Sequence, residues 1–151
     1  MIFQKLIYSY HVVVDSNLTQ LGVVNIISHE KYAFVNLIKV MNGAIIKSKT
    51  TVVQKKLDES EPEILSYLIA ENFTEFFNDV KEIILPFDLT FDYPINFLVP
   101  KRGDKKSLLL LSKKNAMGKK MEFLKTELIK NPSTPTTKLL EIIQRDLKLK
   151  E

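Results

Sequence analysis

The segments LGVVNIIS (residues 21–28), YAFVNLIKVM (residues 32–41) and AIIKSKTTVVQ (residues 44–54) decide how this chain folds. The first two are nearly continuous apolar runs, which is typical of strands buried on both faces of a sheet. Asn42-Gly43 lies between the second and third segments and favours a type I′ hairpin turn, which needs a positive φ at both residues. We therefore expect a three-stranded antiparallel meander.

The third segment alternates in polarity. One face carries Lys47, Lys49 and Thr51, and the other carries Ile46, Ser48, Thr50 and Val52. A strand with one solvated face is typical of the outer position in a sheet, so we expect this strand at an edge.

A helix is expected directly after the meander. Ser60-Glu61-Pro62-Glu63 is a capping box with a proline in the first turn. The apolar spacing that follows predicts a helix through Phe77, which ends at Asn78-Asp79.

Further strands and helices are expected towards the C-terminus. Short strands are predicted at residues 82–87 and 95–99. Asp104 is the predicted N-cap of a long helix, which Gly118 bends or ends. After the break at residues 131–135, a last helix is predicted through Leu147.

This order of elements predicts an α+β fold with an α/β-like second half. Three antiparallel strands followed by helix and strand in alternation is the order of a ribonuclease H-like module, and other α+β layouts are also compatible with it. We expect an N-terminal extension at residues 1–17, the tail of an upstream helical region. The ribonuclease H-like domain would span residues 18–130, and residues 131–151 would form a C-terminal helix.

Composition narrows the class of protein. The 151 residues are 45% hydrophobic and 26% charged, and they include no cysteine. These values are typical of a soluble globular domain and exclude a disulfide framework or a thiolate zinc site. No apolar run approaches the ~18 residues of a membrane span, so we expect a cytoplasmic protein without a membrane partner.

The sequence offers no set of residues for catalysis. A ribonuclease H-like nuclease holds two metal ions with clustered carboxylates, one of them on the first strand. The first segment has no acid, and its amide residue Asn25 cannot replace a bridging carboxylate. His11 and His29 have no partners at the spacing of metal ligands. We therefore predict no catalytic residue, no metal, no cofactor and no small-molecule substrate.

Positive charge is concentrated in one part of the chain. Residues 101–130 contain ten Lys or Arg and three Asp or Glu, a net charge of +7, whereas the whole chain is +4. A local excess of positive charge indicates either a wet helix face or a surface that meets phosphate. The candidate DNA-binding residues are Lys101, Arg102, Lys105, Lys106, Lys113, Lys114, Lys119 and Lys120. The aromatic residues Phe73, Phe76, Phe77, Phe87 and Phe91 are interpreted as core rather than as base-stacking platforms.

The same region resembles a known family. The UvrC family, which belongs to the UvrABC excinuclease, carries the pattern P-x-R-G-x-K-x-x-L-x-x-L-A-x-x-N-A ahead of its catalytic ribonuclease H-like domain. Here the matching residues are Pro100, Arg102, Gly103, Lys105, Leu108, Leu111, Asn115 and Ala116, and Ser112 stands for the usual alanine. The hairpin around Asn42-Gly43 is also similar to a strand pair of that family.

The resemblance implies a function that composition does not show. It implies a role in nucleotide excision repair, in the SOS response to damaged DNA, with UvrB and DNA as partners of the full-length UvrC protein. No catalytic residue of the family falls on this chain, so the implied role is to position nuclease domains and to contact the DNA backbone. The alternative is a packing module that docks on UvrB or on other parts of the same protein. A metal-dependent nuclease is the least favoured hypothesis.

Overall fold

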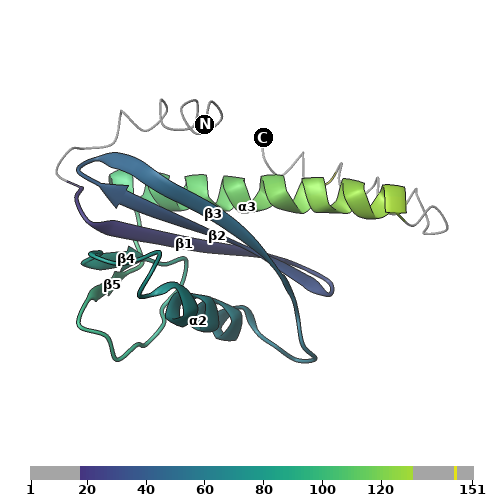
Figure 1. The fold of residues 1–151 in the computed structure, drawn as a ribbon, viewed down its shortest axis with the longest axis horizontal. Coiled ribbons are helices and arrows are strands. Elements are labelled where there is room, and N and C mark those ends of the chain that lie inside the picture. Colours follow the sequence, from purple (N-terminus) through teal and green to yellow (C-terminus); the bar gives the residue numbers. More distant parts are fainter. Residues whose placement is uncertain (1–17, 131–144, 146–151) are drawn as a thin grey trace.

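A computed structural model describes residues 18–130 and residue 145. Within them, the chain forms a five-stranded mixed sheet with a helix on each face (Figure 1). The elements are β1 (Leu21–His29), β2 (Tyr32–Met41), β3 (Ala44–Gln54), α2 (Glu61–Asn72), β4 (Glu82–Ile84), β5 (Asn96–Leu98) and α3 (Gly103–Lys130). The sheet order is β3-β2-β1-β4-β5, with β1–β2 and β2–β3 antiparallel and β1–β4 and β4–β5 parallel.

These elements confirm the predicted α+β class and the three-stranded meander. Asn42 and Gly43 have φ values of +52° and +78°, as the predicted hairpin turn requires. The extension predicted at residues 1–17, with His11, lies outside the described residues. So does the helix predicted within residues 131–151, apart from Arg145.

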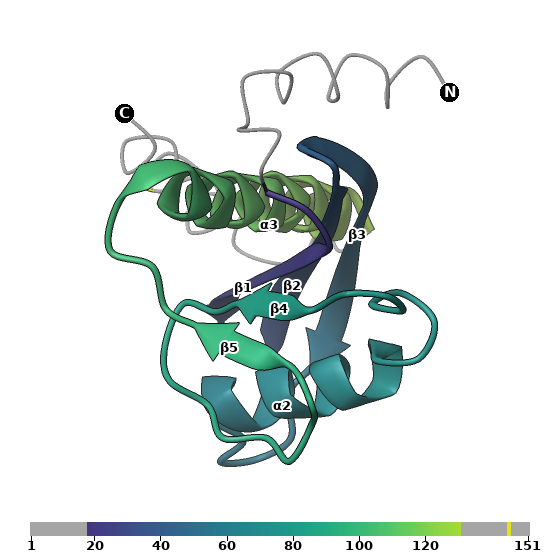
Figure 2. The same ribbon diagram turned by 90° about the vertical axis from the view of Figure 1, so that its left-hand side faces the viewer.

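The sheet separates two apolar layers because β1 and β2 are buried on both faces. On one face, Val24, Val35 and Leu37 pack with Ile64, Leu65 and Ile69 of α2. On the other face, residues of β1 and β2 pack with Leu108, Leu109, Ala116 and Met117 of α3. Figure 2 shows α2 and α3 on opposite sides of the fanned strands. The near-continuous apolar pattern of the first two segments follows from this three-layer arrangement.

β3 lies at the edge of the sheet, as predicted, but its apolar face was assigned wrongly at Ile46. The register shifts between Lys39↔Lys47 and Val40↔Ile45, which leaves Ile46 as the extra residue of a β-bulge. Ile45 is therefore 2% exposed and Ile46 is 42% exposed. A bulge moves the side chains on one side of it to the other face, which simple alternation does not predict.

The predicted start of α2 is confirmed, and its predicted end is wrong. The Ser60 side chain accepts a hydrogen bond from the backbone N–H of Glu63, so Ser60 is the N-cap. The helix ends at Asn72 rather than at Asn78-Asp79. The Asn72 side chain donates to the Leu68 carbonyl at 2.8 Å, and such local bonding competes with helix continuation.

The other predicted boundaries need smaller corrections. β4 ends at Ile84 instead of residue 87, since Pro86 has no N–H to extend the ladder. α3 runs through Gly118 without an end. Gly103, with a φ of +85°, begins α3 and places Asp104 in the first turn rather than at the N-cap.

A buried polar line fixes α3 on the sheet. Asn25 and Asn36 face each other across β1 and β2, and both are buried. Asn25 Nδ2 donates to the Leu109 carbonyl of α3 at 3.0 Å, and Ser112 Oγ donates to the Asn36 carbonyl at 3.1 Å. Asn115 Nδ2 lies 3.4 Å from Asn36 Oδ1. Asn115, which matches the family pattern, and Ser112, which stands where the family has alanine, thus both contact the sheet.

Replacement of Asn36 should destabilise the fold strongly. Asn36 Nδ2 also donates to Thr50 Oγ1 at 2.9 Å and to the Lys49 carbonyl at 3.3 Å. Asn36→Ala would leave these groups unpaired in a buried site, so the free energy of unfolding should fall by about 2–3 kcal/mol in urea denaturation. The exposed Asn96→Ala variant is the control and should stay within about 0.5 kcal/mol of the wild type. An equal loss in both variants would contradict the role of Asn36.

Gly22 should not tolerate a methyl group. A Cβ at this position would lie 2.8 Å from two ring carbons of the buried Phe77 and 3.1 Å from Ile83 Cγ1. Gly22→Ala should therefore lower the free energy of unfolding by about 1–3 kcal/mol. Gly118→Ala meets no atom within 4 Å and lies inside α3, so it should raise stability by about 0.5–1 kcal/mol. Thermal or urea unfolding of the pair tests both signs.

Candidate nucleic-acid interface

The turn between β5 and α3 presents the first two candidate residues to solvent. Pro100 is buried, whereas Lys101 and Arg102 are exposed. The positive φ of Gly103 turns the chain into α3, and a side chain there would be strained. A hollow of about 560 Å³ lies beside the turn, lined by Leu18, Leu98, Val99, Pro100, Lys101, Arg102, Asp104 and Lys105. The structure thus brings Lys101, Arg102 and Lys105 together.

Lys105 and Lys106 lie in the first turns of α3 and are half-buried. Lys105 Nζ forms an ion pair with Glu82 Oε1 of β4 at 2.7 Å. Because this pair is partly exposed, its contribution to stability is about 0–1 kcal/mol. It orients Lys105 beside the turn, and it also neutralises part of its charge.

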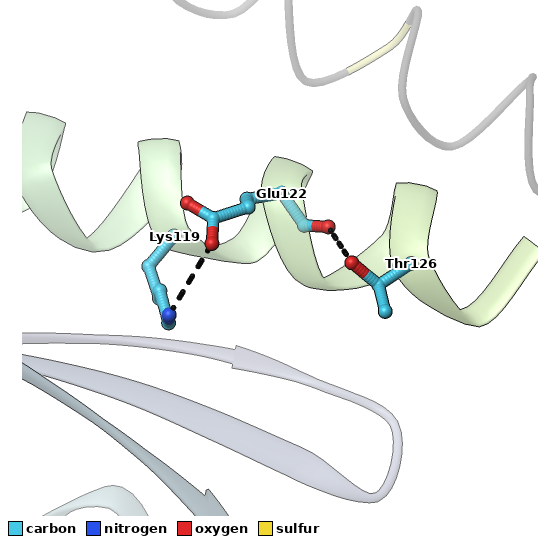
Figure 3. Close-up of polar contacts among 3 residues, drawn as sticks. All are labelled: Lys119, Glu122 and Thr126. Carbon is cyan, nitrogen blue, oxygen red and sulfur yellow. Dashed lines mark hydrogen bonds and ion pairs between the residues drawn. The ribbon is translucent and has the colours of Figure 1, made fainter.

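The remaining candidates spread along α3. Lys113 and Lys114 are exposed, about 12 Å along the helix axis from Lys105 and Lys106. Figure 3 shows Lys119 paired with Glu122 at 3.5 Å, beside the Thr126 hydroxyl that donates to the Glu122 carbonyl. Lys120 is only 6% exposed. The eight residues therefore do not form one surface, and Lys120 is poorly placed to meet a partner.

A second lysine cluster lies away from the predicted basic segment, and the sequence analysis missed it. Lys39 of β2 pairs in register with Lys47 of β3, and Lys49 lies two residues further on the same face. Lys39 Nζ donates to Asn78 Oδ1 at 2.5 Å, and Lys49 Nζ donates to Asn72 Oδ1 at 3.0 Å. Lys47 Nζ lies 6.0 Å from the centroid of the Phe76 ring. The sequence does contain a signal for this cluster, because Lys39 interrupts an apolar strand and the next strand carries Lys47 and Lys49 on one face.

Burial perturbs the ammonium group of Lys39. It is 4% exposed. Burial lowers the pKa of Lys39 below its usual value of 10.5, the charge of Lys47 lowers it further, and Asp79 acts in the opposite direction. The positive charge of Lys39 is thus held against a desolvation cost.

Four of the five aromatic residues lie in or against the α2-side core, as predicted. Phe76 and Phe77 are buried, and Phe87 and Phe91 pack against the same core. Phe73 stacks on Tyr93 with centroids 4.1 Å apart, and Phe91 stacks on Phe97 at 4.7 Å. These ring faces are occupied by other rings of the chain.

The first strand uses its amide for structure. Asn25 is 6% exposed, and its side chain is bonded to α3 and to the Ile26 N–H. Among residues 18–130 and 145, no three His, Asp or Glu side chains are grouped as a metal site. In the same part of the chain, no helix is long and apolar enough to cross a membrane.

Comparisons with known proteins give one consistent result. The family model described as the UvrC ribonuclease H-like domain matches residues 21–122. UvrABC system protein C of Flavobacterium johnsoniae is 39% identical over 137 residues, which is 91% of this chain and 23% of that protein. Its counterpart in Bacteroides thetaiotaomicron is 42% identical over 120 residues, 78% of this chain and 19% of that protein. The chain thus spans about a fifth to a quarter of these relatives.

The pKa of Lys39 should make stability depend on alkaline pH. Between the lowered pKa of the folded state and 10.5, the unfolded chain binds more protons, so stability rises with pH through this window. Lys39→Met removes this contribution. The difference in unfolding free energy between wild type and variant should therefore shift in favour of the wild type as the pH is raised from neutral to about 10.5.

Urea denaturation of both proteins at several pH values measures this difference. The exposed Lys56→Met variant is the matched control for the loss of one lysine. A constant difference for Lys39→Met would show that its pKa is not lowered.

Proposed function

This chain belongs to the UvrC ribonuclease H-like domain family, and we propose that it is a non-catalytic, DNA-contacting domain of a nucleotide excision repair protein. In this proposal the domain positions the nuclease domains of a UvrC-type protein that works with UvrB. The cytoplasmic location, the link to the SOS response and the domain limits 18–130 stay predictions within it.

The observation that carries the proposal is the exposed basic turn ahead of α3. Lys101 and Arg102 are exposed beside the hollow, and neither forms an ion pair with an acid among the described residues. Lys and Arg side chains that reach phosphate supply most of the sequence-independent affinity for DNA. The buried amide of Asn25 supports the non-catalytic part, because this side chain of the first strand is already engaged in holding α3.

The same hollow also favours a second candidate, docking on UvrB or on another part of the same protein. Leu98, which is 36% exposed, and Val99 line it together with the cations. Apolar contact area beside positive charge is typical of a surface that binds protein.

DNA binding is tested with the double variant Lys101→Gln, Arg102→Gln. If about four cations contact phosphates, log K for a labelled duplex should fall against log[salt] with a slope of about −3.6. The double variant should reduce the magnitude of this slope by about 1.8. Fluorescence anisotropy over a salt series measures the slope. Lys125→Gln, Lys130→Gln removes two exposed cations from the far end of α3 and should change little.

Three outcomes separate the candidates. Undetectable duplex binding by the wild type at low salt would contradict DNA contact. If the control pair changed the salt slope as much as the Lys101→Gln, Arg102→Gln variant does, the duplex binding would depend on net charge and not on the turn. If the Lys101→Gln, Arg102→Gln variant lost binding to purified UvrB but bound duplex as the wild type does, the docking candidate would be favoured.

A further inference from the structure

One end of the sheet gathers cations from four separate segments of the chain. This is the end at which β1 begins, and it faces the viewer in Figure 2. Here Gly22 pairs with Lys39, Lys39 pairs with Lys47, and Leu21 pairs with Glu82. The turn before α3 reaches the same end, since Lys105 is bonded to Glu82.

We propose that this end of the sheet is one continuous surface for a DNA backbone, in which the exposed Lys47 and Lys49 make a second contact beyond the turn at Lys101, with the buried Lys39 behind them. The proposal rests on the proposed function because it takes DNA as the partner. It adds two exposed residues that lie on the opposite face of the sheet from α3.

Lys81 connects the two groups of cations. Its backbone N–H donates to the Gln20 carbonyl at 2.8 Å, and its carbonyl accepts from Asn96 N–H at 3.1 Å. Lys81 therefore lies between the start of β1 and the start of β5, and it is exposed. The cations at this end are Lys39, Lys47, Lys49, Lys81, Lys101, Arg102, Lys105 and Lys106. The acids near them are Asp79, Glu82 and Asp104.

The charges of the second cluster are held by neutral groups. Lys39 and Lys49 donate to the side-chain oxygens of Asn78 and Asn72, which are amides and not carboxylates. An amide orients an ammonium group without neutralising it. Lys39 and Lys47 are also directly opposed across two strands, an arrangement of like charges that is destabilising. A phosphate placed near them would relieve this repulsion.

The width of the surface suits a nucleic acid strand. Four strand spacings of about 4.8 Å separate β3 from β5, which gives about 19 Å. One strand of duplex DNA carries a phosphate about every 3.4 Å along the axis, so five or six phosphates fit this width. Lysine is depleted in protein–protein interfaces, and this surface is mostly lysine, so we favour DNA over an acidic protein.

The test removes two exposed cations of the second cluster from the full 151-residue chain. Lys47→Gln, Lys49→Gln should weaken binding to a labelled duplex about tenfold at low salt and reduce the salt slope by about 1.8. Lys31→Gln, Lys56→Gln is the matched control, with the same change of charge at the opposite end of the sheet, and should bind as the wild type does. Thermal unfolding checks that both variants fold.

Lys81→Gln is a second, single substitution at an exposed residue and should reduce the slope by about 0.9. The continuous surface would be overturned if the double variant and Lys81→Gln both bound duplex with the affinity and salt slope of the wild type. If duplex binding by the Lys101→Gln, Arg102→Gln variant were still weakened in that case, the proposed function would hold without the continuous surface. A wild type that fails to bind duplex would overturn both. Polyglutamate serves as the acidic-protein probe. If Lys47→Gln, Lys49→Gln lost polyglutamate binding but bound duplex as the wild type does, the proposal would also be overturned.

Discussion

The buried pair Asn25 and Asn36 is the constraint on which the rest of the structure depends. These two amides lie side by side between the sheet and α3, where an unpaired polar group is costly. Their bonds are satisfied only when Leu109 and Ser112 of α3 lie directly above them. Apolar packing alone would allow α3 to slide or rotate, because Leu, Ala and Met contacts are not directional. The polar line therefore sets the register of α3 on the sheet.

The position of the basic turn follows from that register. With Leu109 held over β1, the first turn of α3 lies at the end of the sheet where β1 and β4 begin, and Lys105 reaches Glu82 of β4 there. Lys101 and Arg102 then project from the turn beside the hollow. The strand that would carry an acid in a ribonuclease H-like nuclease instead carries an amide used for packing. The first strand therefore has no carboxylate, although the chain has the fold of the family.

Local signals predicted most of the elements, and their failures have identifiable causes. The apolar runs, the Asn42-Gly43 turn and the Ser60 capping box depend on neighbouring residues only, and the structure has all three. The face of Ile46 was wrong because a bulge shifts the register against β2. The end of α2 was wrong because the apolar spacing continues to Phe77, while the bonds of Asn72 to Leu68 and Lys49 end the helix earlier. The Lys49 contact joins residues 23 positions apart in the sequence. The bulge lies beside the hairpin turn, where it interrupts a segment whose polarity alternates regularly.

The sequence by itself determined the strands, the start of α2, the family and the basic segment that begins at Lys101. Each is carried by a short pattern, because hydrogen bonding and side-chain periodicity within an element involve near neighbours. Only the tertiary structure decided that Lys39, Lys47 and Lys81 share one end of the sheet with that segment. The parallel pairing of β4 with β1 and the register of β2 against β3 bring these residues together. The β1–β4 pairing joins residues tens of positions apart, and the bulge beside the hairpin turn sets which residue of β3 lies opposite Lys39, so no local pattern of charge reports the surface they make.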